Sequence, residues 1–346
     1  MAALYVTSMG EEAGKSALCA GLGRRLQAEG KKVGYLKPVS IHAERGDRDA
    51  ELMKQFLNLE EPVESLCPVA LGAADLASSS GKGTPSWLKE VEKAYTGVSK
   101  GKDMVMLEGV GGFDAGSELA QVDSKIVEAL KVKAILIIRY QVAIEADKIV
   151  AAAKMLGDHL LGVVINAVPE RRMEMVKANI VPSLEKSDIE VLGMLPEDRA
   201  LLSVTVGELA EHIGGSILSS QDRSDELVES LMVGAMSVDS ALTYLTLKPN
   251  KAVITRSDRP DIQLAALETS TKCLVLTGNI APAPNIISRA QELAVPIVSV
   301  DKDTPGTMAA IEGVFDKAAV YNDKKLERMG QLLEQHLDME AIYQTA

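Results

Sequence analysis

Three consecutive residues near the N-terminus, Gly14, Lys15 and Ser16, have the types and order that bind a nucleotide phosphate. The apolar run Leu4–Ser8 predicts a strand before them, and Lys15 opens a helical pattern. In such a P-loop, backbone N–H groups at the helix N-terminus hold phosphate oxygens, the lysine neutralises charge, and the serine hydroxyl reaches Mg²⁺. The pattern therefore predicts a site for ATP with Mg²⁺, in a loop that also contains Gly10.

The loop departs from the usual P-loop pattern at three positions. Met9 stands where the first glycine is usual, and Ser8 and Glu12 replace glycines of related loops. Glycine allows positive φ and a close approach of the backbone to phosphate. The carboxylate of Glu12 would repel a phosphate unless it faces solvent. These departures predict binding with little turnover, and the alternative is a degenerate loop that has lost its affinity.

Carboxylates and a lysine follow the neighbouring strands. Lys37 comes at the end of the predicted strand Val33–Pro38 and is, with Lys15, a candidate catalytic residue. Asp49 (or Asp47) is a candidate Mg²⁺ ligand together with Ser16 and Glu108, which ends an apolar strand before a glycine-rich loop. The alternatives are a solvent-facing lysine at a strand end and a solvated acidic loop.

Asn166 ends another predicted strand. Its amide carries the donor and acceptor needed to bind the edge of adenine. Pro196 and Glu197 follow the next strand and are predicted to wall the base.

The elements that must position these residues are strands and helices in alternation. Predicted strands are Leu4–Ser8, Val33–Pro38, Met104–Glu108, Ala134–Arg139, Leu161–Asn166 and Val191–Leu195. Predicted helices between them include Lys15–Glu29, Asp49–Leu57, Asp123–Leu130 and Ala143–Met155. Continuous apolar strands alternating with helices predict an α/β fold with a doubly wound parallel sheet, which binds ligands at the carboxyl ends of its strands.

A second, smaller α/β unit is predicted after Gly214-Gly215, so the predicted domains are 1–215 and 216–321. Its predicted strands are Lys251–Thr255, Cys273–Thr277, Ile297–Val300 and Ala318–Val320. Its predicted helices are Ser224–Val233, Asp261–Glu268, Asn285–Leu293 and Thr304–Gly313.

Strand-end residues of this second unit suit a small anionic or nucleotide ligand. The candidates are Asp258, Arg259, Thr277, Gly278 and Asn279. For Asp258, and for Asp261 beside it, a helix cap is an equal alternative.

The last segment, 322–346, is predicted to form a C-terminal helix. Its apolar residues, among them Leu326, Met329 and Leu333, recur near helical spacing. Such a stripe predicts packing on the second domain or on another subunit.

The composition of the chain limits the classes of binding partner that are expected. The formal charge of −12 and the 3% aromatic content argue against nucleic acid and against an anionic membrane. The sequence has no apolar run near the roughly 20 residues that span a bilayer. Three widely spaced cysteines suit reduced thiols, so a cytoplasmic location is expected. Besides the nucleotide, a protein partner or a second copy of the chain is left open.

The first 215 residues or so resemble the dethiobiotin synthetase fold. The resemblance rests on GKS, KP after the second strand, EGVGG, the strand-ending asparagine, and LPEDR followed by TVGELAE. It implies that Lys15 and Ser16 bind phosphate and Mg²⁺, that Asp49 and Glu108 complete the metal site, that Lys37 faces a substrate pocket, and that Asn166 contacts adenine.

The rest of the chain resembles a DRTGG domain, through DRSDELVESLMVGAMSVDSAL, VITRSDRPDIQLAALE and LVLTGN. Arg256 and Ser257 stand where that family tends to have a glycine pair. The two domains together are similar to the N-terminal regulatory half of long-form phosphate acetyltransferases. The acetyltransferase domain of those proteins would follow this region, so that activity is not expected here.

The function expected from the sequence is that of a regulatory or sensory protein that binds ATP and hydrolyses it slowly at most. The alternative is an ATP-dependent ligase that activates a carboxylate or carbamate, with Lys37 stabilising the developing charge. Two further classes are weaker: a scaffold that binds no nucleotide, and a partner-switching ATPase. The latter class carries an additional lysine where Gly10 stands here.

Overall fold

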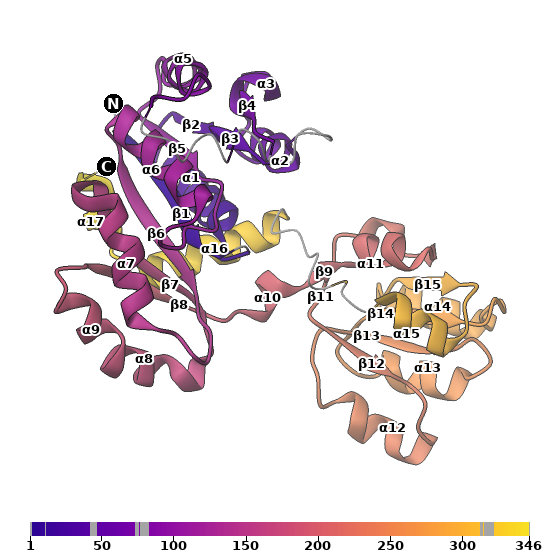
Figure 1. The fold of residues 1–346 in the computed structure, drawn as a ribbon. Coiled ribbons are helices and arrows are strands. Elements are labelled where there is room, and N and C mark those ends of the chain that lie inside the picture. Colours follow the sequence, from indigo (N-terminus) through magenta and orange to yellow (C-terminus); the bar gives the residue numbers. More distant parts are fainter. Residues whose placement is uncertain are drawn as a thin grey trace. The chain divides into compact units, whose positions relative to one another are not determined.

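The chain folds into two compact α/β units (Figure 1). The computed structural model describes residues 2–10, 12–41, 47–72, 76, 83–311, 314 and 322–345. The first unit consists of two segments, one that ends at Glu197 and one that begins at Asp323. The second unit is the segment between them, Asp198–Asn322. The sequence places a boundary at residue 215, so the two divisions differ in segment 198–215 and in the C-terminal segment. Among the described helices, none has both the length and the apolar character needed to cross a bilayer.

The first unit is built on a parallel sheet with the strand order β2-β5-β1-β6-β7-β8. These strands are β1 (Ala2–Met9), β2 (Val33–Leu36), β5 (Met104–Glu108), β6 (Lys133–Arg139), β7 (Leu160–Val168) and β8 (Val191–Pro196), and the short β3 (Val39–Ser40) and β4 (Val69–Ala70) pair with each other. Its helices are α1 (Lys15–Ala28), α2 (Arg48–Phe56), α3 (Val63–Leu66), α5 (Leu88–Val98), α6 (Glu118–Leu130), α7 (Ala146–Leu156), α8 (Met173–Asn179), α9 (Val181–Glu185), α16 (Asp323–His336) and α17 (Met339–Thr345). The six strands predicted for this region are confirmed, and so is the parallel α/β fold.

The strand β1 lies inside the sheet, between β5 and β6. Its residues Leu4, Tyr5 and Val6 are fully buried, which explains the continuous apolar run in the sequence. Because the strands are parallel, the carboxyl ends of β1, β5 and β6 meet at one edge of the sheet. The P-loop, Glu108 and Arg139 follow or end these strands and therefore lie at that edge.

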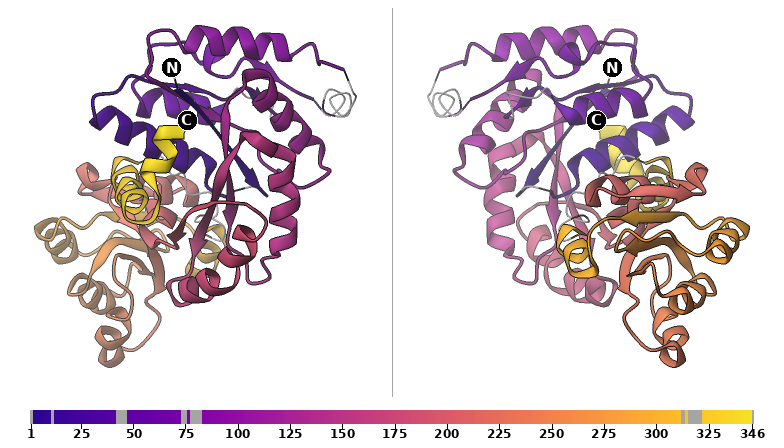
Figure 2. Two further views of the ribbon diagram at one scale, coloured as in Figure 1. Left: turned by 90° about the vertical axis from the view of Figure 1, so that its left-hand side faces the viewer. Right: turned by 90° about the vertical axis from the view of Figure 1, so that its right-hand side faces the viewer.

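The predicted C-terminal helix is present as α16 and α17, but the expectation that it packs on the second domain is wrong, while packing on another subunit stays a prediction. The helix α16 lies along α1 in the first unit (Figure 2). A Cβ at Gly21 of α1 would lie 2.7 Å from both Met329 and Leu333, so glycine permits the close approach. The physical reason is that α1 has apolar residues all round and needs cover on its outer side as well.

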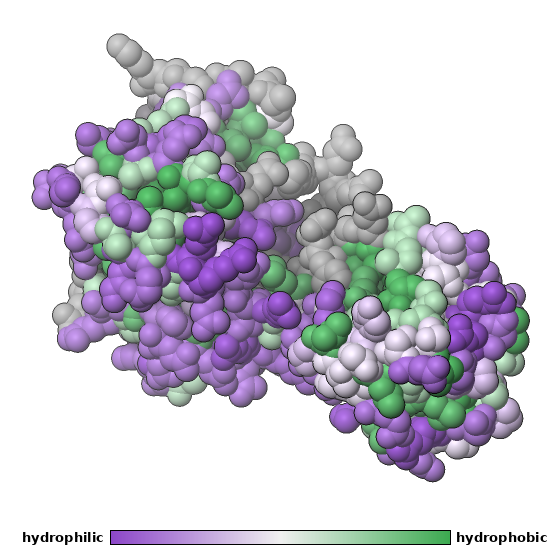
Figure 3. Space-filling model, turned by 90° about the horizontal axis from the view of Figure 1, so that it is seen from below, coloured by the Kyte–Doolittle hydropathy of each residue, from purple (hydrophilic) through white to green (hydrophobic). Residues whose placement is uncertain are grey.

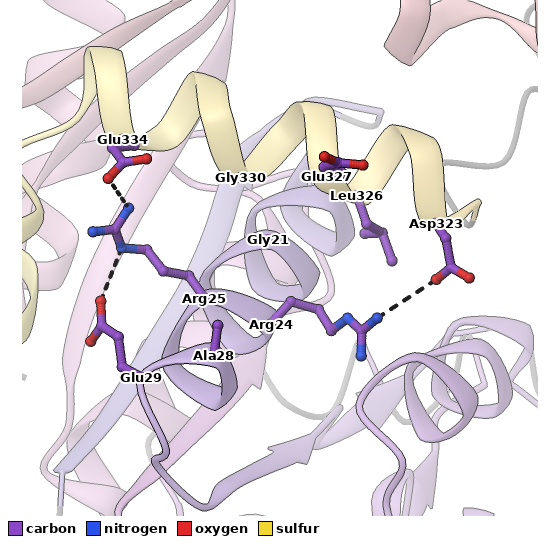
Figure 4. Close-up of a pocket in the computed structure, with 10 residues that line it drawn as sticks. All are labelled: Gly21, Arg24, Arg25, Ala28, Glu29, Asp323, Leu326, Glu327, Gly330 and Glu334. Carbon is purple, nitrogen blue, oxygen red and sulfur yellow. Dashed lines mark ion pairs between the residues drawn. The ribbon is translucent and has the colours of Figure 1, made fainter.

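Ion pairs flank this helix contact around a shallow groove (Figure 4). Arg24 reaches Asp323 at 3.7 Å, and Arg25 reaches Glu334 at 3.2 Å. Beyond α16, the chain continues along the edge strand β8, where Asp338 N–H donates to Leu192 O at 2.8 Å. The C-terminal segment therefore also covers an otherwise open sheet edge.

The second unit contains a sheet with the order β10-β15-β14-β13-β12, in which only the β10–β15 pair is antiparallel. Its strands are β9 (Val204–Thr205), β10 (Ser216–Ser219), β11 (Leu227–Val228), β12 (Ser230–Val233), β13 (Lys251–Arg256), β14 (Thr271–Thr277) and β15 (Ile297–Val300). Its helices are α10 (Arg199–Leu202), α11 (Val206–Ile213), α12 (Val238–Leu245), α13 (Pro260–Leu267), α14 (Pro284–Glu292) and α15 (Thr304–Ile311). Segment 198–215 belongs here by its packing, since Val206 and Leu209 share an apolar cluster with Val298.

One predicted helix of this unit is wrong. Segment Ser224–Val233 forms β11 and β12 instead, because β12 gains a parallel partner in β13 and β11 pairs with β9. Tertiary pairing overrides the local helical pattern here. The predicted strand Ala318–Val320 lies outside the described residues.

The surface of the second unit carries groups of apolar residues between polar ones (Figure 3). Several lie on or next to α12, among them Val238, Leu242 and Leu247.

Candidate nucleotide-binding site

The loop between β1 and α1 is shaped for an anion at the helix N-terminus. Gly14 precedes α1 with φ of 100° and ψ of 22°, a left-handed conformation, and it has no side chain with which to cap the helix. Gly10 also has positive φ, at 74°. The N–H groups of the first turn and the positive end of the helix dipole therefore point toward the carboxyl edge of the sheet, where an anion could bind.

Glu12, one of the departures from the P-loop pattern, adopts φ of 53° and is exposed. Its carbonyl accepts a hydrogen bond from Arg139 Nη1 at 3.3 Å. Arg139 was not among the predicted site residues. The signal for it was present in the sequence, because it is a cation at the carboxyl end of a central strand.

Lys15 lies over the loop that follows β5. Its ammonium donates to Ser8 Oγ at 3.3 Å, and a Cβ at Gly111 would lie only 2.5 Å from Nζ. The two loops are also joined by backbone bonds, from Gly112 N to Gly10 O at 3.3 Å and from Phe113 N to Ser8 O at 2.8 Å. The glycines after Glu108 therefore allow Lys15 and the P-loop backbone to lie close to this loop.

Ser16 and Glu108 are brought together as predicted for a metal site. Ser16 Oγ donates to Glu108 Oε1 at 2.5 Å, and Tyr35 OH donates to Oε2 at 2.8 Å. Burial raises the pKa of Glu108, while the nearby charges of Lys37 and Lys15 oppose that rise. A hydroxyl and a carboxylate are the hard oxygen donors that Mg²⁺ prefers when nucleotide phosphates and water supply the other positions.

Lys37 and Asp49 form an ion pair in the same region. Lys37 Nζ lies 2.6 Å from Asp49 Oδ2 and 2.9 Å from Asp47 Oδ2, and only 12% of the lysine side chain is exposed. Burial alone would lower the pKa of Lys37, but Glu108, Asp49 and Asp47 raise it above its ordinary value. The alternative of a solvent-facing lysine does not describe this residue. Within the described ranges, no group of three or more His, Cys, Asp or Glu residues is arranged to hold a metal by itself.

Asn166 holds the P-loop. Its Nδ2 donates to Ala13 O at 2.8 Å, and its Oδ1 accepts from Ala167 N–H at 2.8 Å. A Cβ at Gly14 would lie 2.4 Å from Nδ2, so the amide and the glycine are in contact. The predicted contact of Asn166 with adenine stays a prediction, as does the role of Pro196 and Glu197, which lie where β8 ends.

A buried carboxylate beneath the site was not predicted. Asp123 of α6 is fully buried and accepts hydrogen bonds from Tyr5 OH at 2.7 Å, from Thr7 Oγ1, and from Val110 N–H at 3.0 Å. Burial raises its pKa. It links β1, which leads into the P-loop, to the loop that follows Glu108. The only signal in the sequence is an aspartate among the apolar positions of a helix.

Comparison with known families agrees with this geometry. The AAA domain family matches residues 2–205, and the DRTGG domain family matches residues 208–314. The chain belongs to the AAA domain family. Its second unit corresponds to the DRTGG match, so the predicted combination of a P-loop domain and a DRTGG domain is confirmed.

This AAA domain protein is also similar to phosphate acetyltransferases. It is 27% identical over 358 residues to that of Nitratidesulfovibrio vulgaris, covering 97% of this chain and 50% of the relative. It is 23% identical over 373 residues to that of Pseudomonas aeruginosa, covering 99% and 52%. The chain thus spans about half the length of the curated relatives it matches. Among solved structures, the MinD cell division protein of Aquifex aeolicus aligns with a TM-score of 0.35 and 19% identity, over 58% of this chain and 84% of MinD.

In the DRTGG unit, four of the five predicted ligand residues line one cavity: Asp258, Arg259, Thr277 and Gly278. Asn279 follows in a left-handed conformation and donates its backbone N–H to Val300 O at 3.4 Å. Arg256, which was not predicted, lines the cavity too. Neither Asp258 nor Asp261 caps α13: Asp258 pairs with Arg256 and Asp261 with Arg259, which occupies the N-cap position.

Proposed function

We propose that this AAA domain protein binds ATP with Mg²⁺ in its first unit and acts as a nucleotide-dependent regulatory protein. The observation that carries the proposal is the cluster of Lys15, Ser16 and Glu108 around the open N-terminus of α1. A helix N-terminus, an ammonium group, and a hydroxyl next to a carboxylate are the three parts that a nucleotide triphosphate with Mg²⁺ needs.

Each residue has a role in the proposed complex. Lys15 leaves Ser8 and turns to the β- and γ-phosphates, while the N–H groups after Gly14 hold their oxygens. Ser16 and Glu108 would hold Mg²⁺, Glu108 directly or through a bound water, while Asp49 stays paired with Lys37. The ion neutralises phosphate charge when bound. Asn166 keeps the loop in position through Ala13 and offers its amide to adenine.

The surroundings of Lys37 favour regulation over the ligase alternative. A ligase would use this ammonium to stabilise negative charge that develops on its substrate. Here two aspartates already neutralise Lys37, at 2.6 and 2.9 Å. Slow hydrolysis at most is therefore proposed, and the ATP-bound state itself is the signal. The receiver is a protein partner or a second copy of the chain, in the cytoplasm. Acetyl transfer, the activity in the name of its relatives, is not proposed for these residues.

The test is a measurement of bound ATP and released phosphate on one preparation. We expect saturable ATP binding that requires Mg²⁺, with less than about one turnover per minute, far below the usual enzyme rate. Ser16→Ala should weaken ATP binding, so that adding Mg²⁺ no longer raises the affinity for ATP. Ser99→Ala, at the exposed end of α5, should leave the effect of Mg²⁺ unchanged. Turnover that rises strongly when an amine and bicarbonate are added would instead support the ligase.

A further inference from the structure

We propose that the DRTGG unit holds a second ligand site, separate from the P-loop, for an organic phosphate with an apolar body, of the nucleoside monophosphate class. The site is a cavity of about 630 Å³ at the carboxyl ends of β12, β13 and β14 and the start of α15. Its volume lies within the range of small-molecule sites, roughly 300–1,000 Å³. Its position is where parallel α/β sheets bind ligands.

Two arginines supply the charge for the phosphate. Arg256 and Arg259 both line the cavity, from the end of β13 and from the first turn of α13. Each is paired with an aspartate two residues further on, Asp258 and Asp261. The Arg256–Asp258 pair is open to water, with 67% and 41% of the side chains exposed, and such pairs contribute little stability. A phosphate can therefore take over the guanidinium of Arg256, for which its oxygens are well matched acceptors, while Arg259, in a half-buried pair with Asp261, adds a second positive charge to the cavity lining.

The loop that carries the arginines is held in place from below. The buried Gln263 donates through Nε2 to the carbonyls of Arg256 at 2.9 Å and Ser257 at 3.1 Å. Arg259 Nη2 donates to Met236 O at 3.2 Å, which ties this loop to the one after β12. The cationic groups are thus mounted on a supported backbone, which lowers the ordering cost of binding.

The floor and walls suit the rest of the ligand. Hydroxyls of Thr277 and Thr304 lie 2.8 Å apart between β14 and α15, and Thr255 Oγ1 donates to Gly234 O at 3.0 Å. Apolar side chains of Val233, Ile254 and Ile280 complete the lining. Ile280 is 52% exposed at the rim, where an apolar or planar group would cover it. Two carboxylates also line the cavity: Asp258 is paired with Arg256, and Asp303 Oδ1 accepts from Gly306 N–H at 2.8 Å. Cations, hydroxyls and apolar walls in one cavity fit a phosphate joined to a nucleoside better than a bare anion.

The test uses the full chain with Lys15→Ala, which removes the main phosphate contact of the first site. AMP is titrated by calorimetry without Mg²⁺, and adenosine and inorganic phosphate are titrated separately. We expect AMP to bind at least about tenfold more tightly than either fragment. Adding Arg256→Gln and Arg259→Gln should weaken AMP at least about tenfold. Arg289→Gln, an ion-paired arginine on α14 outside the cavity, should leave AMP affinity unchanged within about twofold.

Hydrogen exchange on the same samples locates the site, with AMP expected to protect segments 256–259 and 277–280. The proposal is overturned if AMP does not saturate the Lys15→Ala protein, if adenosine or phosphate binds as well as AMP, or if the double arginine change leaves affinity intact. ATP binding by the unchanged chain is scored separately, so failure of this site is distinguishable from failure at the P-loop.

Discussion

The two units differ in the burial of the charged residues near the carboxyl ends of their strands, although one is built on a parallel sheet and the other on a mostly parallel one. In the first unit, Glu108 and Asp123 are buried at or beneath the carboxyl edge of the sheet, and hydroxyl and N–H groups donate to them. In the second unit, the arginines at the cavity are exposed (Arg256) or half-buried (Arg259), and each is paired with a nearby aspartate. The buried charge of the second sheet, Lys251, starts β13, at the opposite end from the cavity.

This difference determines whether the side chains that would bind a ligand also stabilise the fold of each unit. Buried carboxylates are desolvated whether or not a ligand is present, so the first site is built into the fold and its polar groups are also structural. Exposed arginines have little energetic connection to folding, so the second site can change without loss of the unit. Substitutions of the buried carboxylates at the first site should therefore affect stability, whereas substitutions of the arginines at the second site should affect mainly ligand affinity.

The largest effect is expected from Asp123→Ala. The change leaves Tyr5 OH, Thr7 Oγ1 and Val110 N–H without their shared acceptor in a buried site. Each orphaned group costs roughly 1–3 kcal/mol, so unfolding of the first unit by urea should lose about 3–5 kcal/mol. Glu128→Ala, at an exposed position on the same helix, should stay within about 0.5 kcal/mol. If Asp123→Ala lowers the free energy of unfolding no more than Glu128→Ala does, the buried carboxylate of the first unit has no structural role and the comparison fails.

The next effect is a pH dependence at Lys251. Burial lowers its pKa to about 8 in the folded chain, from an ordinary value of 10.5. Between these values the unfolded chain binds more protons, so stability should rise with pH above about 8 and level off near 10.5. The lowered pKa is worth about 3 kcal/mol in full, at roughly 1.4 kcal/mol per pKa unit, and somewhat more than about 2 kcal/mol of it should be gained by pH 10, where the unfolded lysine is still mostly protonated.

The measurement for Lys251 is urea unfolding of the second unit from pH 7 to 10. Lys251→Met should flatten the rise with pH, because it removes the group that titrates. Lys272→Met, at a half-exposed lysine paired with Glu226, should keep the rise. Equal slopes in the unchanged chain and in Lys251→Met would show that Lys251 is not the buried charge of this unit.

The smallest effect comes from a matched pair of glycines. Gly111 and Gly278 both have positive φ, 83° and 94°, so alanine at either should cost about 1 kcal/mol of stability. They differ in space, because a Cβ at Gly111 meets Lys15 Nζ at 2.5 Å, whereas one at Gly278 meets nothing within 4 Å. Gly111→Ala should weaken ATP about tenfold, because strain at this position disturbs the bond from Gly112 N–H to Gly10 O that joins its loop to the P-loop, whereas Gly278→Ala in the second unit should not. ATP titration of both variants decides this, and equal affinities would remove the role given to Gly111.

The features of this structure that could be predicted are those set by residues that follow one another closely in the sequence. A strand, a glycine loop and Lys15-Ser16 follow one another along the chain, and parallel strands bring Glu108 beside Ser16 by their topology alone. Asp123 could not be found in this way, because its function depends on which face of α6 is buried against β1. The packing partner of α16 could not be predicted either. Its apolar stripe predicts that it packs against another element, but not that this element is α1 of the first unit. Segment 224–233 forms strands only because β13 and β9 are there to pair with it.

The most direct test of the central claim is ATP titration, with Mg²⁺, of the unchanged chain, of Lys15→Ala and of Lys89→Ala, an exposed lysine on α5. Lys15 is the cation of the P-loop, and loss of its charge-assisted bonds to phosphate should weaken ATP at least about 100-fold, or roughly 2.7 kcal/mol. Lys89→Ala should match the unchanged chain. Equal ATP affinity in Lys15→Ala and the unchanged chain, or an unchanged chain that binds no ATP, would contradict the account.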